Sequence, residues 1–529
     1  MLQTTRAYRG MVTAPHHLAS EAGLRVLREG GNAIEAAVAT AATLTVVYPH
    51  MNALGGDNFW LIHGPDHNVS AIDACGAAAS KASMEFYGSQ GFDAIPSRGP
   101  LAALTVAGAV SGMAAALKAS AASGGTMPLE RLFEDAIHYA EAGVPAPATL
   151  AGNIAAKMGD LAEVAGFGDV YLPDGTPLAT GARVTQPRLA ETMRMLAQDG
   201  LDSFYRGTLS ERIAADLARV GSPITGEDLE RHKALDVTPL TLDVAGHRLF
   251  NMPPPTQGLA CLMIPGIYER LGVQEAETRE FVHALVEATK QAFRIRDAHV
   301  SDPAYMREPA GSFLQSDRLD AMAADIDPER AAPWPHPSAE GDTVWFGAVD
   351  GEGRAVSAIQ SIYWEFGSGV ILEDTGLTWQ NRGTSFSLDP RHHNHLMPGR
   401  RPFHTIQPAL AHLSDGRVMP YGTMGGEGQP QTQAMIFARH VLHGMGLQES
   451  VTAPRWLLGR TWGEETTTLK LENRIGDEVL DWLRAAGHVV EVTGPYEDMM
   501  GHAGALVLHP DGLIEGATDP RSDGAAVGY

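Results

Sequence analysis

The architecture of this chain follows from one segment, Gly341-Asp342-Thr343-Val344-Trp345-Phe346-Gly347-Ala348-Val349-Asp350. The segment is an apolar run that carries a hydroxyl near its start and leads into turn residues at 350–353. A second apolar run returns over residues 355–363. The pattern therefore predicts a β-hairpin whose first strand begins at Thr343.

The position of Thr343 suggests a chemical use for its hydroxyl. In mid-chain the residue is a poor nucleophile, because no base adjoins it. Cleavage between Asp342 and Thr343 would place an α-amine beside the hydroxyl, and such an amine has an ordinary pKa of about 7.7–8.0. Pairing of a threonine with its own amine is an established means of activation. A threonine at a strand start can equally be only a β-former, so these residues alone leave both interpretations open.

Composition narrows the class of protein. The chain has 529 residues, enough for two or three ordinary domains or one large layered domain. Its net charge of −24 would repel phosphate backbones and anionic lipid, which argues against nucleic-acid and membrane partners. Two cysteines, Cys75 and Cys261, are too few for a disulfide framework. Residues 1–9 lack the apolar run of a signal peptide, so the sequence predicts a cytoplasmic protein.

Apolar periodicity predicts helices early in the chain and a mixture of elements later. Gly30-Gly31 separates two predicted helices within residues 15–47, and Asn32 is the expected cap of the second. Strands are expected near 59–63, 240–251, 488–493 and 504–508, and further helices at 128–142, over most of 210–300, at 430–446 and at 475–486. This order is typical of a layered α+β fold.

The segment from Arg307 to Glu340 has a different composition. Charged and small residues alternate there with Pro309, Pro328, Pro333, Pro335 and Pro337. The pattern predicts an extended, accessible connection that ends just before Thr343. It fits a processing loop and a plain domain linker equally well.

Glycines gather at residues 422–430, Gly-Thr-Met-Gly-Gly-Glu-Gly-Gln-Pro. Their unshielded N–H groups could converge on an anion, as an oxyanion hole or a phosphate cradle requires. The chain has neither a GxxxxGK[ST] nor a GxGxxG motif, which argues against phosphate. A tight turn before a helix would need the same residues. The histidine-rich stretch 391–395 fits no metal-ligand spacing and is predicted to be a surface loop.

Taken together, these segments resemble the γ-glutamyltranspeptidase family. The resemblance rests on Gly30-Gly31-Asn32-Ala33-Ile34-Glu35-Ala36-Ala37-Val38, on Pro49-His50-Met51 and Gly55-Gly56, on the Thr343 hairpin and on Gly425-Gly426. It implies an N-terminal-nucleophile hydrolase of the α+β class with a four-layer αββα sandwich, made as a zymogen that cleaves itself. The large fragment would be 1–342 and the small fragment 343–529, together forming one domain. No metal or cofactor is implied, and a homo-oligomer is left open.

The resemblance also implies roles for catalytic residues. Asp342 and Thr343 flank the cleavage site, and Thr343 is the nucleophile. Ser361 stands where the family has a hydroxyl that supports the amine of the nucleophile. Gly425 and Gly426 match the oxyanion-hole glycines.

Substrate-binding positions show matches and departures. His404-Thr405 occupies the place of a substrate-binding Ser-Ser pair, and Tyr363 replaces an Asn. Glutamyl-specific members hold the substrate α-carboxylate with an Arg that residues 72–77 lack. They hold the α-amine with an Asp, where this chain has Ser385, and Arg382 replaces a neutral residue nearby. Loss of a buried charge partner costs about 2–5 kcal/mol, so selectivity should move away from amino acids.

The implied reaction is hydrolysis of a small anionic amide, with oxamate converted to oxalate and ammonia. The amino-acid sequence of residues 361–383 is similar to the sequences of one branch of the family, whose members act on oxamate, on glutathione-like substrates and on cephalosporins. Alternatives are therefore a γ-glutamyl hydrolase or transferase, a cephalosporin-acylase-like amidase, and an uncleaved binding protein. Arg382 is the expected anion anchor, unless it pairs with Glu365 or Glu373 and only braces a turn.

Overall fold

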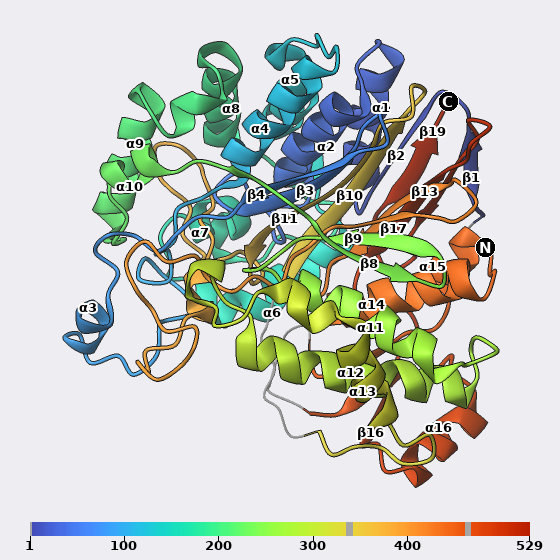
Figure 1. The fold of residues 1–529 in the computed structure, drawn as a ribbon. Helices are drawn as coiled ribbons and strands as arrows, with labels where there is room; N and C mark the ends of the chain where they lie inside the picture. Colours follow the sequence, from blue (N-terminus) through green and yellow to red (C-terminus); the bar gives the residue numbers. More distant parts are fainter. Residues whose placement is uncertain (1–2, 335–341, 461–466) are drawn as a thin grey trace.

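Two seven-stranded sheets pack face to face in the computed structural model, which describes residues 3–334, 342–460 and 467–529 (Figure 1). The predicted hairpin is confirmed: β10 (Asp342–Asp350) pairs antiparallel with β11 (Ala355–Tyr363) in the first sheet. Both are interior strands of that sheet. Its order is β19 (Ala525–Gly528), β2 (Gly10–Ala14), β10, β11, β3 (Asp57–His63), β4 (Val69–Ala74) and β7 (Leu235–Val237).

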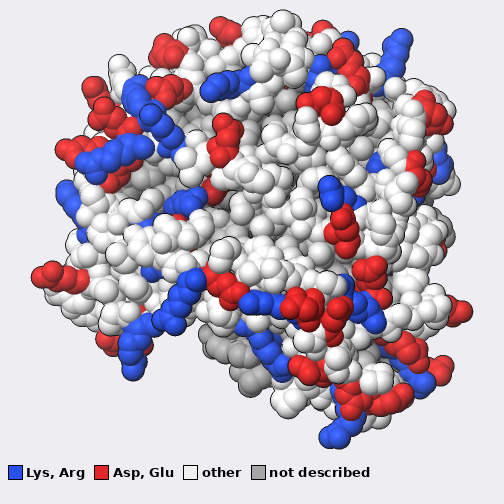
Figure 2. All heavy atoms as spheres, in the orientation of Figure 1, with Lys and Arg blue, Asp and Glu red and all other residues white. Residues whose placement is uncertain are grey.

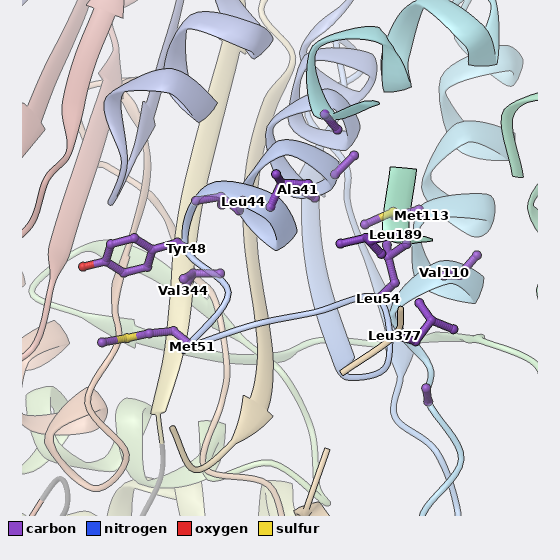
Figure 3. Close-up of a cluster of buried hydrophobic side chains, with 14 of the residues drawn as sticks. Ala41, Leu44, Tyr48, Met51, Leu54, Val110, Met113, Leu189, Val344 and Leu377 are labelled. Atoms are coloured by element: carbon purple, nitrogen blue, oxygen red, sulfur yellow. The ribbon is translucent and has the colours of Figure 1, made fainter. Parts of the chain in front are cut away.

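Side chains of β10 alternate between two buried layers, as a strand period of two requires. Val344 and Phe346 join the cluster formed with the first helical layer. Trp345 and Val349 join the cluster between the two sheets. Figure 3 shows Val344 with Tyr48 of the α2 end, and both belong to the helix-side cluster. The hairpin is therefore covered on both faces.

The second sheet lies against Trp345. Its order is β1 (Thr5–Ala7), β18 (Ile514–Thr518), β17 (Ala503–Leu508), β13 (Val418–Thr423), β12 (Ala409–His412), β9 (His247–Asn251) and β8 (Leu240–Val244). A Cβ added at Gly422 or Gly504 would meet the Trp345 ring at 2.2 or 2.4 Å. These glycines therefore let the indole pack directly on the backbone of the second sheet.

Helices cover the outer face of each sheet, which completes the four-layer αββα arrangement (Figure 1). The first layer consists mainly of α1 (His17–Arg28), α2 (Ala33–Val47), α4 (Ala109–Ala122), α5 (Leu129–Ala142) and α8 (Pro187–Asp199). The other layer consists mainly of α11 (Gly258–Leu271), α12 (Arg279–His299), α13 (Ser316–Ala324), α14 (Gly428–Phe437) and α16 (Asp477–Ala485).

The predicted cap at Asn32 is confirmed. Its side chain accepts the N–H groups of Ile34 and Glu35, and the Glu35 carboxylate accepts the N–H of Asn32 at 2.8 Å. The same end of α2 is tied to the hairpin, because Asp350 accepts the N–H of Ala33 at 2.9 Å. This reciprocal capping fixes where the helix begins.

Smaller elements complete the described chain. They are α3 (Met84–Gly88), β5 (Val144–Pro145), α6 (Ala148–Leu161), α7 (Phe167–Tyr171), β6 (Arg183–Val184), α9 (Thr208–Val220), α10 (Gly226–Arg231), α15 (Leu447–Thr452), β14 (Trp456–Leu458), β15 (Leu469–Glu472) and β16 (Val490–Thr493). None of the helices in the described ranges is long and apolar enough to cross a bilayer.

The prediction of an extended connection over 307–340 is wrong for its first half. Residues 310–314 form a 3-10 helix, and Ser316–Ala324 forms α13. Phe313 and Leu319 are buried in the cluster with α11. The prolines lie outside these helices, so the apolar spacing between them was free to form helical turns. Residues 335–341 lie outside the described residues.

Charge is distributed without a dominant basic patch on the face drawn in Figure 2, where acidic and basic side chains are interspersed. Many charged side chains of the described residues form ion pairs. Arg131 with Glu29 and Arg206 with Asp202 are examples. The face shown therefore offers no extended cationic surface of the kind that binds nucleic acid.

Candidate active site

A β-bulge places Thr343 at the start of β10. The backbone of Asp342 pairs with Tyr363 and that of Val344 with Gln360, so two residues of β11 oppose Thr343 alone. One of these two is Ser361. Thr343 is fully buried. The side chain of Asp342, the other predicted cleavage-site residue, lies outside the described part of the structure.

Gln429 connects the nucleophile candidate to the glycine turn. Its Nε2 donates to the Thr343 Oγ1 at 3.1 Å, and it follows the turn directly on α14. Gly425 and Gly426 have φ angles of 118° and 50°, a region that residues with a Cβ rarely adopt. Sequence reasoning quoted Gln429 within the glycine block but assigned it no role. Its position directly after the glycine turn was the sequence feature that could have indicated a role for Gln429 in the site.

The carbonyl side of the glycine turn is held by hydrogen bonds. The Gly425 carbonyl accepts the N–H of Gly428 at 2.7 Å, and the Gly426 carbonyl accepts Nε2 of Gln257 at 2.8 Å. Gln257 is itself held by Arg296, whose guanidinium donates to its Oε1 at 2.9 Å. With both carbonyls engaged, the turn has a fixed orientation beside Thr343.

Arg296 extends this support to the neighbouring residue of the turn. Its guanidinium also donates to Glu427 Oε1 at 2.6 Å, and both side chains are only 3% exposed. A buried ion pair of this kind is costly to assemble but rigid once its hydrogen bonds are satisfied. Gln257 and Arg296 come from α11 and α12, far from the turn in sequence, and no local pattern pointed to them.

Arg382 gathers several predicted site residues around its guanidinium. It lies in a 3-10 helix over Arg382–Ser385 and is fully buried. One terminal nitrogen donates to Thr405 Oγ1 at 3.1 Å and the other to Ser361 Oγ at 3.2 Å. Its Cζ lies 4.0 Å from the centre of the Tyr363 ring. Burial lowers the pKa of Arg382 to about 10, so the guanidinium remains charged at neutral pH.

Glu365 and Glu373, the two acidic residues that could have paired with Arg382, form ion pairs with other side chains. Glu365 lies 3.8 Å from Arg98 and 3.6 Å from Lys157, and Glu373 lies 3.4 Å from Arg219. Neither carboxylate forms an ion pair with Arg382 among the described residues. A turn-bracing ion pair with Glu365 or Glu373 is therefore the wrong interpretation of Arg382.

Tyr363 occupies a strained backbone position. Its φ of 83° is unusual for a residue with a bulky side chain. Its N–H donates to Ser361 Oγ at 2.8 Å. Strain of this kind is retained where surrounding contacts impose it, and it clusters at functional sites. Here the contacts are those that stack the phenol ring on Arg382.

His404 lies against a buried carboxylate that the sequence analysis did not single out. Its Nε2 is 3.2 Å from Asp57 Oδ2, although the two groups lack the alignment of a hydrogen bond. Asp57 Oδ1 accepts the N–H groups of Gly76 and Gly108 and Nε2 of Gln380. Burial raises the pKa of Asp57 to about 7 and lowers the pKa of His404 well below its ordinary value. Asp57 and Asn58 are the polar residues directly before the predicted apolar strand 59–63.

Several buried polar atoms around these residues have no hydrogen-bond partner within the described residues. They are Nε of Arg382, both ring nitrogens of His404, Oδ2 of Asp57, Oε1 of Gln429 and Oγ of Ser385. Unsatisfied buried polar atoms are uncommon in native proteins. Each of the atoms named here could therefore bind a polar group of a ligand. The carbonyl of Ser385 accepts Nδ2 of Asn394 at 2.8 Å, and no described contact joins Ser385 to Thr343.

The region that lacks the family arginine receives one from elsewhere in the chain. Arg401 donates to Asp73 at 2.7 Å and lies 3.5 Å from Asp302. Together with Cys75 and Val106 it lines a cavity of about 570 Å³. Because Arg401 is already paired with two carboxylates, it is a weaker anion partner than Arg382.

One group of potential metal ligands occurs among the described residues, outside the predicted site. Ligand atoms of His283, Glu287 and His488 lie within 4.8 Å of one another. The ammonium of Lys290 already contacts Glu287 Oε1 at 2.6 Å. That cation occupies the carboxylate oxygen a metal would need. The stretch 391–395 does not contribute to a cluster of this kind in the described ranges.

A four-layer sandwich with a buried hydroxyl residue at the start of an interior strand, next to a glycine turn, is the arrangement of N-terminal-nucleophile hydrolases. The chain belongs to the γ-glutamyltranspeptidase family, whose sequence profile matches residues 19–529. It is therefore an enzyme of that family.

The chain is similar along its length to two curated proteins and one solved structure. The chain is 55% identical to an oxamate amidohydrolase proenzyme of Klebsiella pneumoniae, over 98% of each chain. It is 40% identical to a glutathione hydrolase-like proenzyme of Bacillus subtilis, again over 98% of each. A cephalosporin acylase from Bacillus halodurans superposes with a TM-score of 0.92 at 32% identity, covering 100% of this chain and 97% of that one.

Proposed function

We propose that the protein cleaves itself between Asp342 and Thr343 and then hydrolyses oxamate to oxalate and ammonia. The observation that carries this proposal is the buried guanidinium of Arg382, held by Ser361 and Thr405, with its Nε unpartnered. A small carboxylate is the natural partner of such a group. The similarity to an oxamate amidohydrolase proenzyme supports the same substrate.

The bonds that change in maturation lie at the start of β10. Thr343 Oγ attacks the carbonyl carbon of Asp342, the C–N bond breaks, and the acyl group moves from nitrogen to oxygen. This shift frees the amine of Thr343, and water then hydrolyses the resulting ester, which releases the Asp342 carboxyl and restores the Thr343 hydroxyl. Gln429, which donates to Thr343 Oγ1, would hold the hydroxyl in place for the attack. The fragments would be 1–342 and 343–529.

Turnover would use the new amine as the base. It takes the Oγ proton as Oγ attacks the amide carbon, and the N–H groups of Gly425 and Gly426 stabilise the oxyanion. Loss of one such donor costs about 2.7–4 kcal/mol. The proton passes to the leaving nitrogen, ammonia departs, and an ester to Thr343 remains. Water attacks the ester and releases the acid.

Selectivity follows from the charges at the site. Arg382 offers a cation to a substrate carboxylate, while Ser385 stands where a carboxylate would be needed to hold an α-ammonium group. The carboxylate present, Asp57, is largely engaged through Oδ1 and faces His404. A small anion without an amine therefore fits better than a γ-glutamyl compound. A cytoplasmic location and any oligomer remain predictions.

The test compares cleavage and three substrates in one preparation. A denaturing gel should show two fragments, and sequencing of the smaller one should begin at Thr343. Thr343→Ala should remain one inactive chain. Ammonia release from oxamate should exceed release of p-nitroaniline from a γ-glutamyl anilide and hydrolysis of a glutaryl cephalosporin. A single full-length band would favour an inactive binding protein, and preference for the anilide would favour the γ-glutamyl reaction.

A further inference from the structure

Four polar side chains that the proposed reaction does not use lie buried between α12 and the end of α16. Glu287 and Lys290 are each 2% exposed and form an ion pair at 2.6 Å. His283 and His488 are also buried and lie 2.9 Å apart, from Nδ1 to Nε2. Burying charge costs stability unless hydrogen bonds compensate, so the partners of this cluster indicate what it does.

The ion pair holds both backbone groups of a single residue. Glu287 Oε2 accepts the N–H of Ala332 at 3.2 Å, and Lys290 Nζ donates to the Ala332 carbonyl at 2.7 Å. Ala332 lies in the segment 327–334, which precedes the proposed cleavage site. The charged side chains of Glu287 and Lys290 therefore bond the N–H and carbonyl groups of Ala332, which secondary structure would otherwise pair.

The histidines hold the same segment at a second point. The Asp327 carbonyl lies 2.9 Å from His283 Nε2 and can only accept, so that nitrogen carries the proton. His283 Nδ1 is then an acceptor for the Nε2–H of His488. Burial, with Lys290 and His283 nearby, lowers the pKa of His488 to about 3. His488 is therefore neutral, and the hydrogen bonds run in one direction, from His488 through His283 to the Asp327 carbonyl.

The partners come from both sides of the proposed cleavage site. His488 follows α16 and belongs to residues 343–529, whereas the other three side chains belong to α12 and residues 1–342. A backbone bond from the Ala331 N–H to the Ala486 carbonyl, at 2.8 Å, joins the same two parts. Once the chain is cut, the Ala331–Ala486 bond and the His283–His488 contact still join the two fragments, whereas Glu287 and Lys290 hold Ala332 on α12 of its own fragment.

We propose that His283, Glu287, Lys290 and His488 form a tail clamp, which fastens residues 327–334 to α12 of the large fragment and, through His488, couples this contact to the small fragment. The inference rests on the proposed cleavage at Asp342.

Trypsin offers a direct test, because Arg330 is exposed and lies between the two clamped points. Cutting after Arg330 requires local opening of the segment. The variant Glu287→Gln/Lys290→Met keeps the cluster neutral and should raise the rate of this cut about tenfold or more, since two charge-assisted hydrogen bonds are lost. Cutting after the exposed Arg231 serves as an internal reference and should not change.

Two further variants separate the clamp from general destabilisation. Ala332→Pro removes the N–H that Glu287 accepts without changing α12, and should raise the same cut if the double variant fails to fold. Asp135→Asn, which removes a buried carboxylate paired with Arg25 in the other helical layer, should leave it unchanged. Equal rates after Arg330 in wild type and Ala332→Pro would overturn the clamp. A wild-type chain that never cleaves would overturn the proposed function instead, and the Arg330 comparison would still decide whether the cluster holds the segment.

Discussion

Arg382→Gln removes the guanidinium to which the anion-binding role is assigned. The Gln side chain is shorter and keeps an amide NH2 donor, but it loses the charge and most of the contacts to Ser361 and Thr405. Self-cleavage should proceed, because it involves no external anion. Turnover should fall, because the substrate carboxylate loses its charged partner.

The size of the effect follows from the burial of Arg382. A hydrogen bond to a charged group contributes about 1.5–3 kcal/mol, and full burial means that solvent does not screen it, so the upper value applies. About 3 kcal/mol corresponds to a fall of roughly 10²-fold in kcat/KM. Stability should change less. Without the nearby cation the pKa of Asp57 should rise further, so the carboxyl becomes neutral and no buried anion is left unpaired.

The assay is steady-state ammonia release from oxamate by mature enzyme at pH 7, with a gel to show the extent of cleavage. Arg98→Gln is the control, because Arg98 braces the turn after β11 through the carbonyls of Glu365 and Gly367 at 2.6 and 2.5 Å. It should lower the melting temperature yet keep kcat/KM within about threefold of wild type. An Arg382→Gln enzyme that matures and retains near-full kcat/KM would refute the anchor role. Equal losses in the two variants would show that only the turn geometry matters.

Other contacts at the site lead to three further expectations. The pKa of Asp57 is raised to about 7, so its anion forms as pH rises from 6 to 8 and opposes an anionic substrate. KM for oxamate should therefore rise up to about tenfold over that pH range. The Asp57→Asn variant should show a KM that does not change with pH in the same titration. Gln429→Leu removes the donor to Thr343 Oγ1, so the half-time of self-cleavage on a gel time course should lengthen by roughly 5–10-fold; an unchanged half-time would remove Gln429 from the mechanism. Tyr363→Leu loses the ring 4.0 Å from Arg382, and kcat/KM for oxamate should drop by about tenfold while Thr343 still becomes a new N-terminus; a value equal to wild type would show that the stacking contributes nothing to binding.

Local patterns in the sequence were sufficient for the elements that begin or end at a clear signal. The apolar run from Val344 to Val349 predicted a strand, and the turn at 350–353 predicted its hairpin partner. Gly30-Gly31 and Asn32 marked one helix end and the next helix start. Each of these signals depends on residues within about four positions of one another, which is the range over which backbone propensity acts.

Between Pro309 and Pro328 the same reasoning was wrong, because composition outweighed periodicity. Proline and charge suggested an extended linker, but the apolar spacing of Phe313 and Leu319 allowed helical turns that α11 then buried. Burial against a distant element is a tertiary effect, and such effects override local preference.

The sequence by itself determined that Thr343 starts a strand and that a glycine turn exists at Gly425-Gly426. It also determined that position 385 is a serine and not an acidic residue. Only the tertiary structure decided which groups meet. It brought Arg382 onto Ser361 and Thr405 rather than onto an acidic partner. It set Asp57 against His404 and joined Gln429 to Thr343. These contacts cross tens to hundreds of residues, and they form because the two sheets pack over one shared core, a choice that no local periodicity encodes.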